Sequence, residues 1–437
     1  MEKVKIIGAG LAGCEAAWTL AQRGIEVELY EMKPEYKSAA HSSDLFAELV
    51  CSNSLKAARI NSAAGLLKEE MRRIGSICME AAEKCQVPAG GALAVDREIF
   101  SSIITEKISN CKNITVKHER VDSVPRDGIV IVATGPLTDG ALAEDIAKLC
   151  SANYLNFYDA AAPIVTADSI DTDIAFRASR YGKGEDDYIN CPFSKSEYEE
   201  FHKELVSAEV AEIHEFDKPV TVYEGCMPIE ILASRGLDAA RYGPMKPVGL
   251  INPKTGHRPW AAVQLRAENR EARLYNLVGF QTNLKWSEQK RVFSMIPGLK
   301  NAEFVRYGVM HRNSFINSPR LLNSDYSLRE HPNISVCGQL SGVEGYMESA
   351  SSGIAAALAV ARKLLGKEPI HFPNFTMLGA LSKYISDETV TKFQPMGANF
   401  GVLPPLAEKI KDKSERYSAL SARSLSWFDE NAENFKR

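Results

Sequence analysis

The chain has 437 residues, of which 45% are hydrophobic and 25% are charged, and its formal net charge is −4. These values exclude a disordered or fibrous chain, and the length favours two or three structural units over one. No apolar run reaches the roughly 18 residues that a membrane span needs, and Met1–Lys3 leads into an apolar strand instead of a signal peptide. We therefore expect a cytoplasmic protein without membrane contact.

The chain opens with the pattern strand, glycine-rich turn, helix and strand. The apolar strand Val4–Ile7 precedes a GxGxxG turn, the apolar positions of Cys14–Gln22 indicate a helix, and Glu26–Tyr30 indicates a second strand. The glycines of the turn are Gly8, Gly10 and Gly13. The first allows the tight turn, the second lets the backbone approach a pyrophosphate, and the third lets helix and strand pack closely. Glu31 ends the second strand, where its carboxylate can accept hydrogen bonds from a ribose. The pattern predicts a dinucleotide-binding βαβ unit.

A polar segment, Lys33–Ser62, follows the βαβ unit, and its length favours a role at a site. Helices are then predicted over Ala63–Ile74 and over Arg97–Ile108, with Asp96 as the N-cap of the second. Strands are predicted over Ile114–Val121 and Gly128–Val132.

The alternation of strands and helices is lost from about 151 to 330 and returns with a strand at Ile334–Cys337 and a small-residue helix at Ser349–Leu365. The sequence therefore predicts an α/β fold with a discontinuous Rossmann-type domain, formed by residues 1–150 and 331–437, and an inserted α+β substrate domain at 151–330. The last segment is expected to end in helices.

Two further turns favour FAD over NAD as the dinucleotide. The predicted strand Gly128–Val132 is followed by Ala133-Thr134-Gly135. FAD proteins with this architecture have an Ala-Thr-Gly turn at the same place. The late strand enters a turn with Gly338, Gln339, Gly345 and Tyr346, and the amides of the helix that follows would face the flavin. The commoner FAD pattern has Gly-Asp where this chain has Gly338-Gln339. No second GxGxxG in a βαβ context follows Gly13, so a separate nicotinamide domain is not expected.

Three segments carry a resemblance to a known family: GAGLAGCEAAW, ELVCSNSLK and VCGQLSGVEGYMESASSG. In these segments the chain resembles the folate-dependent, FAD-containing tRNA uracil-5-methyltransferases. The resemblance implies methylation of the T-loop uridine at carbon 5, with methylenetetrahydrofolate as carbon source and NADH or NADPH as reductant. One branch of the family acts on ribosomal RNA, and the sequence leaves this choice open.

Nine scattered cysteines without a CxxC pair argue against a disulfide framework and against a zinc site, and no metal is expected. Alkylation of uracil carbon 5 requires a nucleophile to add first to carbon 6. By resemblance Cys226, in a loop bounded by Gly225 and Pro228, is that nucleophile, and Cys51 is a second reactive thiol that removes the carbon 5 proton. A redox dithiol of Cys51 and Cys226 is the alternative. Cys14 and Cys337 are expected in the core.

An RNA substrate requires basic groups for its phosphates and exposed rings for unpaired bases. Between Lys254 and Arg320 the chain has twelve Lys or Arg against four Glu, with eight interleaved aromatic residues, of which at least half are expected in the core. Candidate RNA contacts in this segment are Lys290, Arg291, His311 and Arg312, and Tyr346 is a candidate for stacking on the pterin of folate. The alternatives are a flavin oxidoreductase for a small molecule and a non-catalytic RNA-binding partner.

Overall fold

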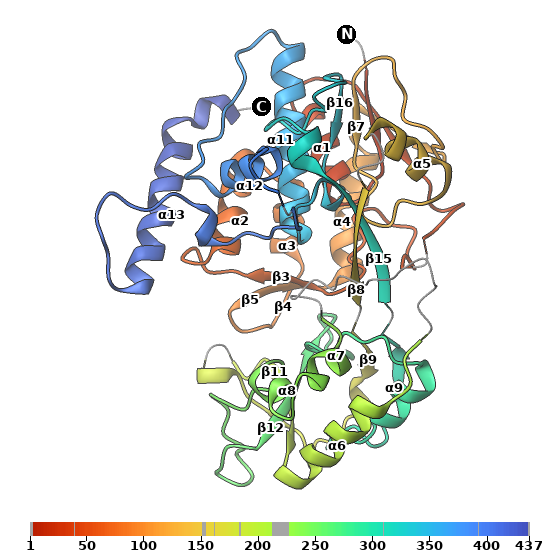
Figure 1. The fold of residues 1–437 in the computed structure, drawn as a ribbon, viewed down its shortest axis with the longest axis vertical. Helices are drawn as coiled ribbons and strands as arrows, with labels where there is room; N and C mark the ends of the chain where they lie inside the picture. Colours follow the sequence, from red (N-terminus) through yellow and green to blue (C-terminus); the bar gives the residue numbers. More distant parts are fainter. Residues whose placement is uncertain are drawn as a thin grey trace.

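The structure is a computed structural model that describes residues 3–38, 40–150, 154–160, 162–182, 185–211, 227–308, 310–391 and 393–435, with the backbone alone at 154–160 and 310–312. Two bodies lie one above the other in Figure 1. An antiparallel ladder runs between them, made of β8 (Tyr154–Ala160) and β15 (Met310–Ile316).

The first body is built on a parallel sheet of five strands. Its order is β16-β7-β1-β2-β6, and every neighbouring pair is parallel. The strands are β1 (Val4–Ile7), β2 (Val27–Glu31), β6 (Ile114–His118), β7 (Val130–Val132) and β16 (Ile334–Val336). Because β16 joins the edge beside β7, a late segment of the chain completes a sheet that the first part begins. The predicted Rossmann-type core is confirmed.

Helix α1 (Leu11–Ala21) packs closely against α11 (Tyr346–Leu364), beside the sheet in Figure 1. Gly353 permits this approach, and Gly13 lets α1 pack closely on the turn after β1. A Cβ on Gly13 would lie 1.8 Å from the Gly8 carbonyl oxygen, and one on Gly353 would lie 2.1 Å from that of Ala12. The other elements of this body are α2 (Ala63–Ile74), α3 (Ile77–Lys84), α4 (Arg97–Ser109), α5 (Gly140–Leu149), α10 (Ser318–Leu321), α12 (Met377–Ser386), α13 (Lys413–Glu430), and the small sheet of β3 (Ser54–Ala57), β4 (Gln86–Val87) and β5 (Ala92–Val95).

Most predicted elements of the first body form close to their expected bounds, and the N-cap at Asp96 is confirmed by its side chain, which accepts a hydrogen bond from Ile99 N. Both cofactor-facing helices begin three residues earlier than predicted. Gly10 and Gly345 are their N-caps, so the residues directly after each glycine already form the first helical turn.

The second body has a six-stranded antiparallel sheet of order β10-β11-β12-β13-β9-β14, covered by helices. Its strands are β9 (Ile164–Thr166), β10 (Phe176–Arg177), β11 (Tyr188–Phe193), β12 (Ala261–Ala267), β13 (Leu274–Leu277) and β14 (Phe304–Arg306). Its helices are α6 (Lys195–Ser207), α7 (Ile229–Ser234), α8 (Ala239–Tyr242) and α9 (Trp286–Phe293). The second body therefore has the α+β architecture that was expected for the inserted domain.

Each body has its own hydrophobic core. The second core extends in sequence from Val165 to Leu299, with Phe304 packed against it, while Phe315 and Leu328 belong to the first core. The predicted boundaries at 150/151 and 330/331 stay a proposal, and this packing favours a return to the first body near residue 315. No helix in the described part of the chain is long and apolar enough to cross a membrane.

Candidate functional site

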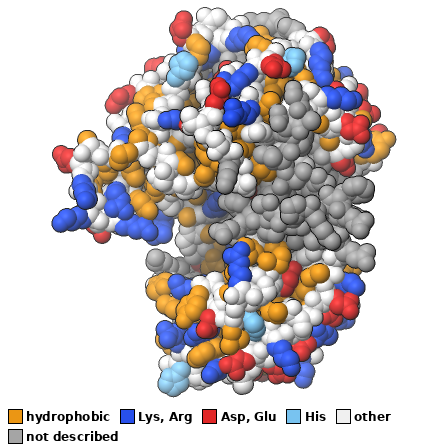
Figure 2. Space-filling model, in the orientation of Figure 1, with side chains coloured by type: hydrophobic (Ala, Val, Ile, Leu, Met, Phe, Trp, Pro, Cys, Tyr) orange, Lys and Arg blue, Asp and Glu red, His pale blue; other side chains and the backbone are white. Residues whose placement is uncertain are grey.

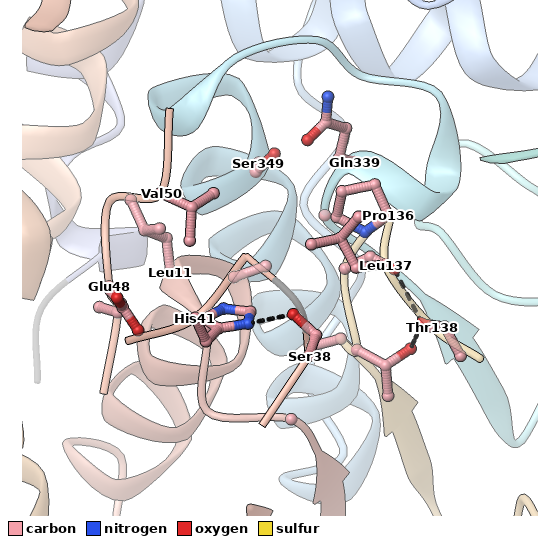
Figure 3. Close-up of a pocket in the computed structure, with 18 of the residues that line it drawn as sticks. Leu11, Ser38, His41, Glu48, Val50, Pro136, Leu137, Thr138, Gln339 and Ser349 are labelled. Carbon is pink, nitrogen blue, oxygen red and sulfur yellow. Dashed lines mark hydrogen bonds between the residues drawn. The ribbon is translucent and has the colours of Figure 1, made fainter. Parts of the chain in front are cut away.

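A cavity of about 330 Å³ lies at the carboxyl edge of the parallel sheet. Its lining includes the residues that follow β1, β2, β7 and β16, the first residues of α1 and α11, and the segment from Ser38 to Lys56. Ligands of open parallel sheets bind at this edge. Figure 3 shows three separate segments around the space: Ser38 to Val50 on one side, Pro136–Thr138 on another, and Gln339 with Ser349 above them.

The glycine turn lines one end of this cavity, and its geometry fits a pyrophosphate. Gly10 is the N-cap of α1, and no side chain caps the helix, so its first amides are left for a ligand. A Cβ on Gly10 would meet no protein atom within 4 Å, whereas one on Gly8 would lie 2.7 Å from the Ala133 carbonyl oxygen. Gly8 and Gly13 are therefore needed for packing, and Gly10 leaves room for the ligand.

Glu31 is the last residue of β2 and lies in the wall of the same cavity. Its side chain is buried, and its two carboxylate oxygens accept hydrogen bonds from Ala9 N at 2.8 Å and Lys33 N at 3.0 Å. These bonds fix the carboxylate beside the glycine turn, where its remaining lone pairs can accept from a ribose.

The second predicted half of the cofactor site lies across the cavity. Ala133 and Gly135 follow β7, and Gly338 follows β16, and all three line the space. Gly345 is the N-cap of α11 and again no side chain caps the helix, so a second set of amides faces the ligand. Gln339 donates from Nε2 to Glu344 Oε2 at 2.6 Å, which holds the turn between strand and helix. The residues present therefore fit an FAD that extends between the two helix N-termini.

Cys51 lies in the wall of the cavity and is partly buried. Its backbone N–H donates to the hydroxyl of Tyr346 at 2.7 Å, and Ser52 N donates to the same oxygen at 3.2 Å. The structure thus brings together the cofactor turn, the first residue of α11 and one of the two candidate thiols. The Tyr346 hydroxyl serves this backbone contact, and burial raises its pKa well above the usual range.

Three arginines hold the chain on either side of Cys51. Arg97 donates from Nη1 to the Leu49 carbonyl, and Arg306 donates from Nη2 to the Val50 carbonyl at 2.5 Å. Arg266 donates to Ser52 Oγ at 2.9 Å and to Asn53 Oδ1 at 3.0 Å. Arg97 and Arg306 each interact electrostatically with the Cys51 thiol, and Glu268, which pairs with Arg97, adds one negative charge to the same surroundings.

The sequence reasoning missed these arginines and several polar groups of the segment before Cys51. Ser38 Oγ lies 2.7 Å from His41 Nδ1, as Figure 3 shows, and burial lowers the pKa of His41. Glu48 Oε2 lies 3.8 Å from Lys33 Nζ, and both side chains are largely buried. The length of the polar segment Lys33–Ser62 indicated a role at a site, but its sequence did not indicate which of its side chains take part.

A further ion pair closes the far end of the cavity. Lys56 donates to Glu348 Oε1 at 2.6 Å and to the Glu344 carbonyl at 3.1 Å, and Glu348 also accepts from Ala398 N. Lys56 has a positive φ of 64°, which turns its side chain out of the β3 strand pattern.

For three of the predicted site residues the structure describes no side chain. Cys226 falls within 212–226, outside the described residues, and of His311 and Arg312 only the backbone in β15 is described, where they pair with Asp159 and Tyr158. The expectation that Cys14 and Cys337 are core residues is confirmed, since both are fully buried. Burial raises the pKa of the Cys337 thiol to about 12 and that of Cys14 well above its usual value.

Three of the basic residues in this segment have partners or positions inside the protein. Arg266 is buried, Arg306 is directed into the Cys51 segment, and Arg291 pairs with Glu204 and Glu288. A count of charges cannot separate surface groups from internal ones. Figure 2 likewise shows basic and acidic side chains intermixed over the lower body on this face. Lys290 is exposed on α9.

Half of the aromatic residues in this segment are core residues, as expected: Tyr275, Phe280, Phe293 and Phe315 are buried. Trp286 is 65% exposed and stacks on Tyr307 with ring centroids 5.9 Å apart. In the described residues there is no group of three His, Cys, Asp or Glu side chains that could hold a metal ion.

The chain is similar to known proteins over nearly its whole length. A family model described as glucose inhibited division protein A (GIDA) matches residues 3–368. The chain is 57% identical over 425 residues to "methylenetetrahydrofolate--tRNA-(uracil-5-)-methyltransferase TrmFO" of Acetivibrio thermocellus, covering 97% of each chain. It is 56% identical over 426 residues to the protein of the same name from Pelotomaculum thermopropionicum, covering 98% of this chain and 97% of that one.

A solved structure shares the fold. Aquifex aeolicus GidA superposes with a TM-score of 0.71 at 16% identity, covering 99% of this chain and 75% of that chain. The full-length relatives and the family model together show that this chain belongs to the methylenetetrahydrofolate-dependent tRNA uracil-5-methyltransferases of the GIDA family.

Proposed function

We propose that this chain methylates carbon 5 of a uridine in the T-loop of tRNA, with methylenetetrahydrofolate as carbon donor, NADH or NADPH as reductant and FAD as bound cofactor. The observation that carries the proposal is the position of Cys51, which lies in the wall of the FAD-fitting cavity and is tied to the first residue of α11. The family's named activity supports the same assignment. We propose the cytoplasm as its location, where tRNA and folate are available.

The chain's own residues would act on the uracil in a defined order. The Cys226 thiolate adds to carbon 6, which forms a C–S bond and makes carbon 5 nucleophilic. Carbon 5 then attacks the one-carbon unit of the folate and forms a C–C bond. The Cys51 thiolate removes the carbon 5 proton, and the electron pair that this frees breaks the bond between the one-carbon unit and the folate nitrogen, so that tetrahydrofolate leaves. After the one-carbon unit has been reduced, loss of Cys226 from carbon 6 restores the 5,6 double bond and frees the product. When bound, FAD supplies the two electrons that reduce the one-carbon unit to a methyl group.

The positive groups around Cys51 suit its proposed role. The Arg97 and Arg306 guanidiniums stabilise negative charge on the segment, and their hydrogen bonds to Leu49 and Val50 carbonyls fix its backbone. The nicotinamide nucleotide and the folate would use the same side of the cavity in turn, since the sequence offers no second dinucleotide turn. That order predicts ping-pong kinetics.

The test is covalent trapping with tRNA that contains 5-fluorouridine. The wild type should form a covalent complex, and Cys226→Ala should not, while its flavin content and its reduction by the nicotinamide nucleotide stay unchanged. Cys51→Ala should still trap this RNA, because 5-fluorouridine has no carbon 5 proton to lose, yet it should not release methylated product from normal tRNA. Normal trapping by Cys226→Ala would refute its role as nucleophile.

The choice of RNA is tested in parallel. Mass mapping of 5-methyluridine in cells that lack the protein should show loss from tRNA and no change in ribosomal RNA. Loss from ribosomal RNA alone would reassign the substrate, and no loss from either, together with turnover of a small molecule, would favour the oxidoreductase.

A further inference from the structure

A second cavity, of about 210 Å³, lies where the two bodies meet. The Gly90-Gly91 turn of the first body forms one wall, and Arg180, Tyr188 and Gln264 of the second body form another. The two bodies are joined here by Tyr188, whose hydroxyl donates to the Ala89 carbonyl at 2.9 Å. The cavity is therefore a fixed feature of the contact between the bodies.

Arg180 places a positive charge at this cavity, and among the described residues it forms no ion pair. Its Nε and Nη2 atoms are buried and have no hydrogen-bond partner among the described residues. Burial lowers the pKa of the Arg180 guanidinium. Asp187, a carboxylate close in sequence, accepts from Gly90 N at 2.6 Å instead. A buried cation without a partner is costly, so the arrangement suits an anionic ligand.

The rim of this cavity is aromatic and apolar. Tyr181 is 60% exposed, and its backbone N–H donates to the Gly249 carbonyl at 2.9 Å. A Cβ on Gly249 would lie 3.0 Å from the Tyr181 ring, so the ring lies against bare backbone. Exposed rings beside a cationic pocket are the features with which proteins bind unpaired nucleotides.

The second cavity is linked to the catalytic segment through β12. Gln264 lines the cavity, and Arg266, two residues on, faces the same side of the strand. Arg266 interacts with the hydroxyl of Tyr188, its partner on β11, and donates to Ser52 Oγ beside Cys51.

We propose that the Arg180 cavity binds a backbone phosphate of the RNA substrate, close to the uridine that enters the flavin cavity. The inference rests on the proposed function and adds a specific contact to it. A guanidinium binds phosphate oxygens through paired N–H groups, and the exposed ring of Tyr181 in the same cavity can stack on an unpaired base. The carboxylates of a folate tail share this oxyanion chemistry, and the experiment separates the two sources.

The test compares Arg180→Gln and Arg180→Lys with Lys203→Gln, an exposed residue of α6 that loses the same charge. Binding of a tRNA transcript is measured over a range of salt concentrations, together with the KM for methylenetetrahydrofolate and the flavin content. Arg180→Gln should raise the Kd for tRNA about tenfold and lower the slope of log K against log salt by about one phosphate contact. Arg180→Lys should keep the slope and bind at intermediate strength, and Lys203→Gln should match the wild type.

Each other result would overturn the inference. A raised KM for folate with unchanged tRNA affinity would assign the cavity to the folate tail. Unchanged values for both ligands would leave Arg180 with a structural role. If Arg180→Gln fails to fold, Arg180→Lys alone provides the test. Lysine cannot make the paired N–H contacts of a guanidinium, so wild-type affinity for tRNA in Arg180→Lys would also overturn the inference. A wild type that binds no tRNA would instead refute the proposed function.

Discussion

The backbone N–H of Cys51 donates to the hydroxyl oxygen of Tyr346, at 2.7 Å and across 295 residues of sequence. Tyr346 is the first residue of α11, the helix whose N-terminus faces the cofactor cavity. The contact therefore fixes a candidate catalytic thiol relative to the cofactor.

Tyr346→Phe removes the acceptor that Cys51 N and Ser52 N share. Two buried donors would lose their partner at a cost of about 1–3 kcal/mol, so we expect the segment to move and single-turnover methylation to slow by about tenfold or more. Flavin content should stay at the wild-type level. Tyr384→Phe is the matched control, because its hydroxyl donates to the Gln394 carbonyl in another part of the molecule. Equal rates for both variants would contradict a positioning role for Tyr346.

Gly10 and Gly13 should fail in different ways when a side chain is added. A Cβ on Gly10 meets no protein atom, and its φ of −71° suits any residue, so Gly10→Val should lack flavin colour and have the thermal stability of the flavin-free wild type. A Cβ on Gly13 would lie 1.8 Å from the Gly8 carbonyl oxygen, so Gly13→Ala should be destabilised by about 3 kcal/mol or more. Flavin absorbance and thermal unfolding of both variants decide this. Full flavin occupancy in Gly10→Val would refute the cofactor site.

The ion pair of Arg97 and Glu268 joins α4 of the first body to the second body, with N to O distances of 2.5 and 3.2 Å. Glu268 is almost fully buried, so Glu268→Gln leaves a poorly compensated arginine and should cost about 2–4 kcal/mol in urea unfolding. Glu209→Gln, which breaks the exposed pair with Lys285, should cost less than about 1 kcal/mol. Similar costs for the two variants would show that the buried pair does not hold the bodies together.

Glu70 should make stability depend on pH. It is fully buried and accepts from Met377 N, Leu378 N and Ser424 Oγ, and burial raises its pKa to about 7. The folded chain then binds more protons than the unfolded chain between the ordinary carboxyl pKa and about 7. This contribution is therefore complete below the unfolded pKa and is lost as the pH rises through about 7.

The measurement is urea unfolding of the wild type and Glu70→Gln at several values between about pH 5 and about pH 8. The wild type should lose stability relative to the variant as the pH rises, by at most about 1.4 kcal/mol for each unit of pKa shift. Glu106→Gln, at an exposed position, is the control and should parallel the wild type. A constant difference between wild type and Glu70→Gln over this range would contradict the raised pKa.

The parts of the site that the sequence predicted are those whose signal is local. Val4 to Glu31 forms one continuous strand, turn, helix and strand, so residue spacing alone placed the glycine turn and the acidic residue at one edge. Gly338 and Gly345 were found in the same way, from a strand followed by a turn.

The surroundings of Cys51 could not be predicted in this way, because Arg97, Arg266 and Arg306 come from separate elements that only folding brings together. For a related reason the charge count of the basic segment could not show which of its groups face solvent, since Arg266 is buried. Arg180 gave no sequence signal, because its lack of a partner is a property of the folded environment.

The order of strands in the parallel sheet has a consequence during synthesis. The glycine turn and β7 leave the ribosome early, but β16 and α11 follow roughly 200 residues later, which corresponds to about 10–40 s of translation. Until then the α1 face that Gly353 approaches has no cover, and only one of the two amide-lined ends of the cavity exists. Cofactor capture is therefore a late event in the life of the nascent chain, and a ribosome that stalls within the inserted body leaves a flavin-free intermediate with an uncovered apolar helix, the kind of surface that chaperones bind.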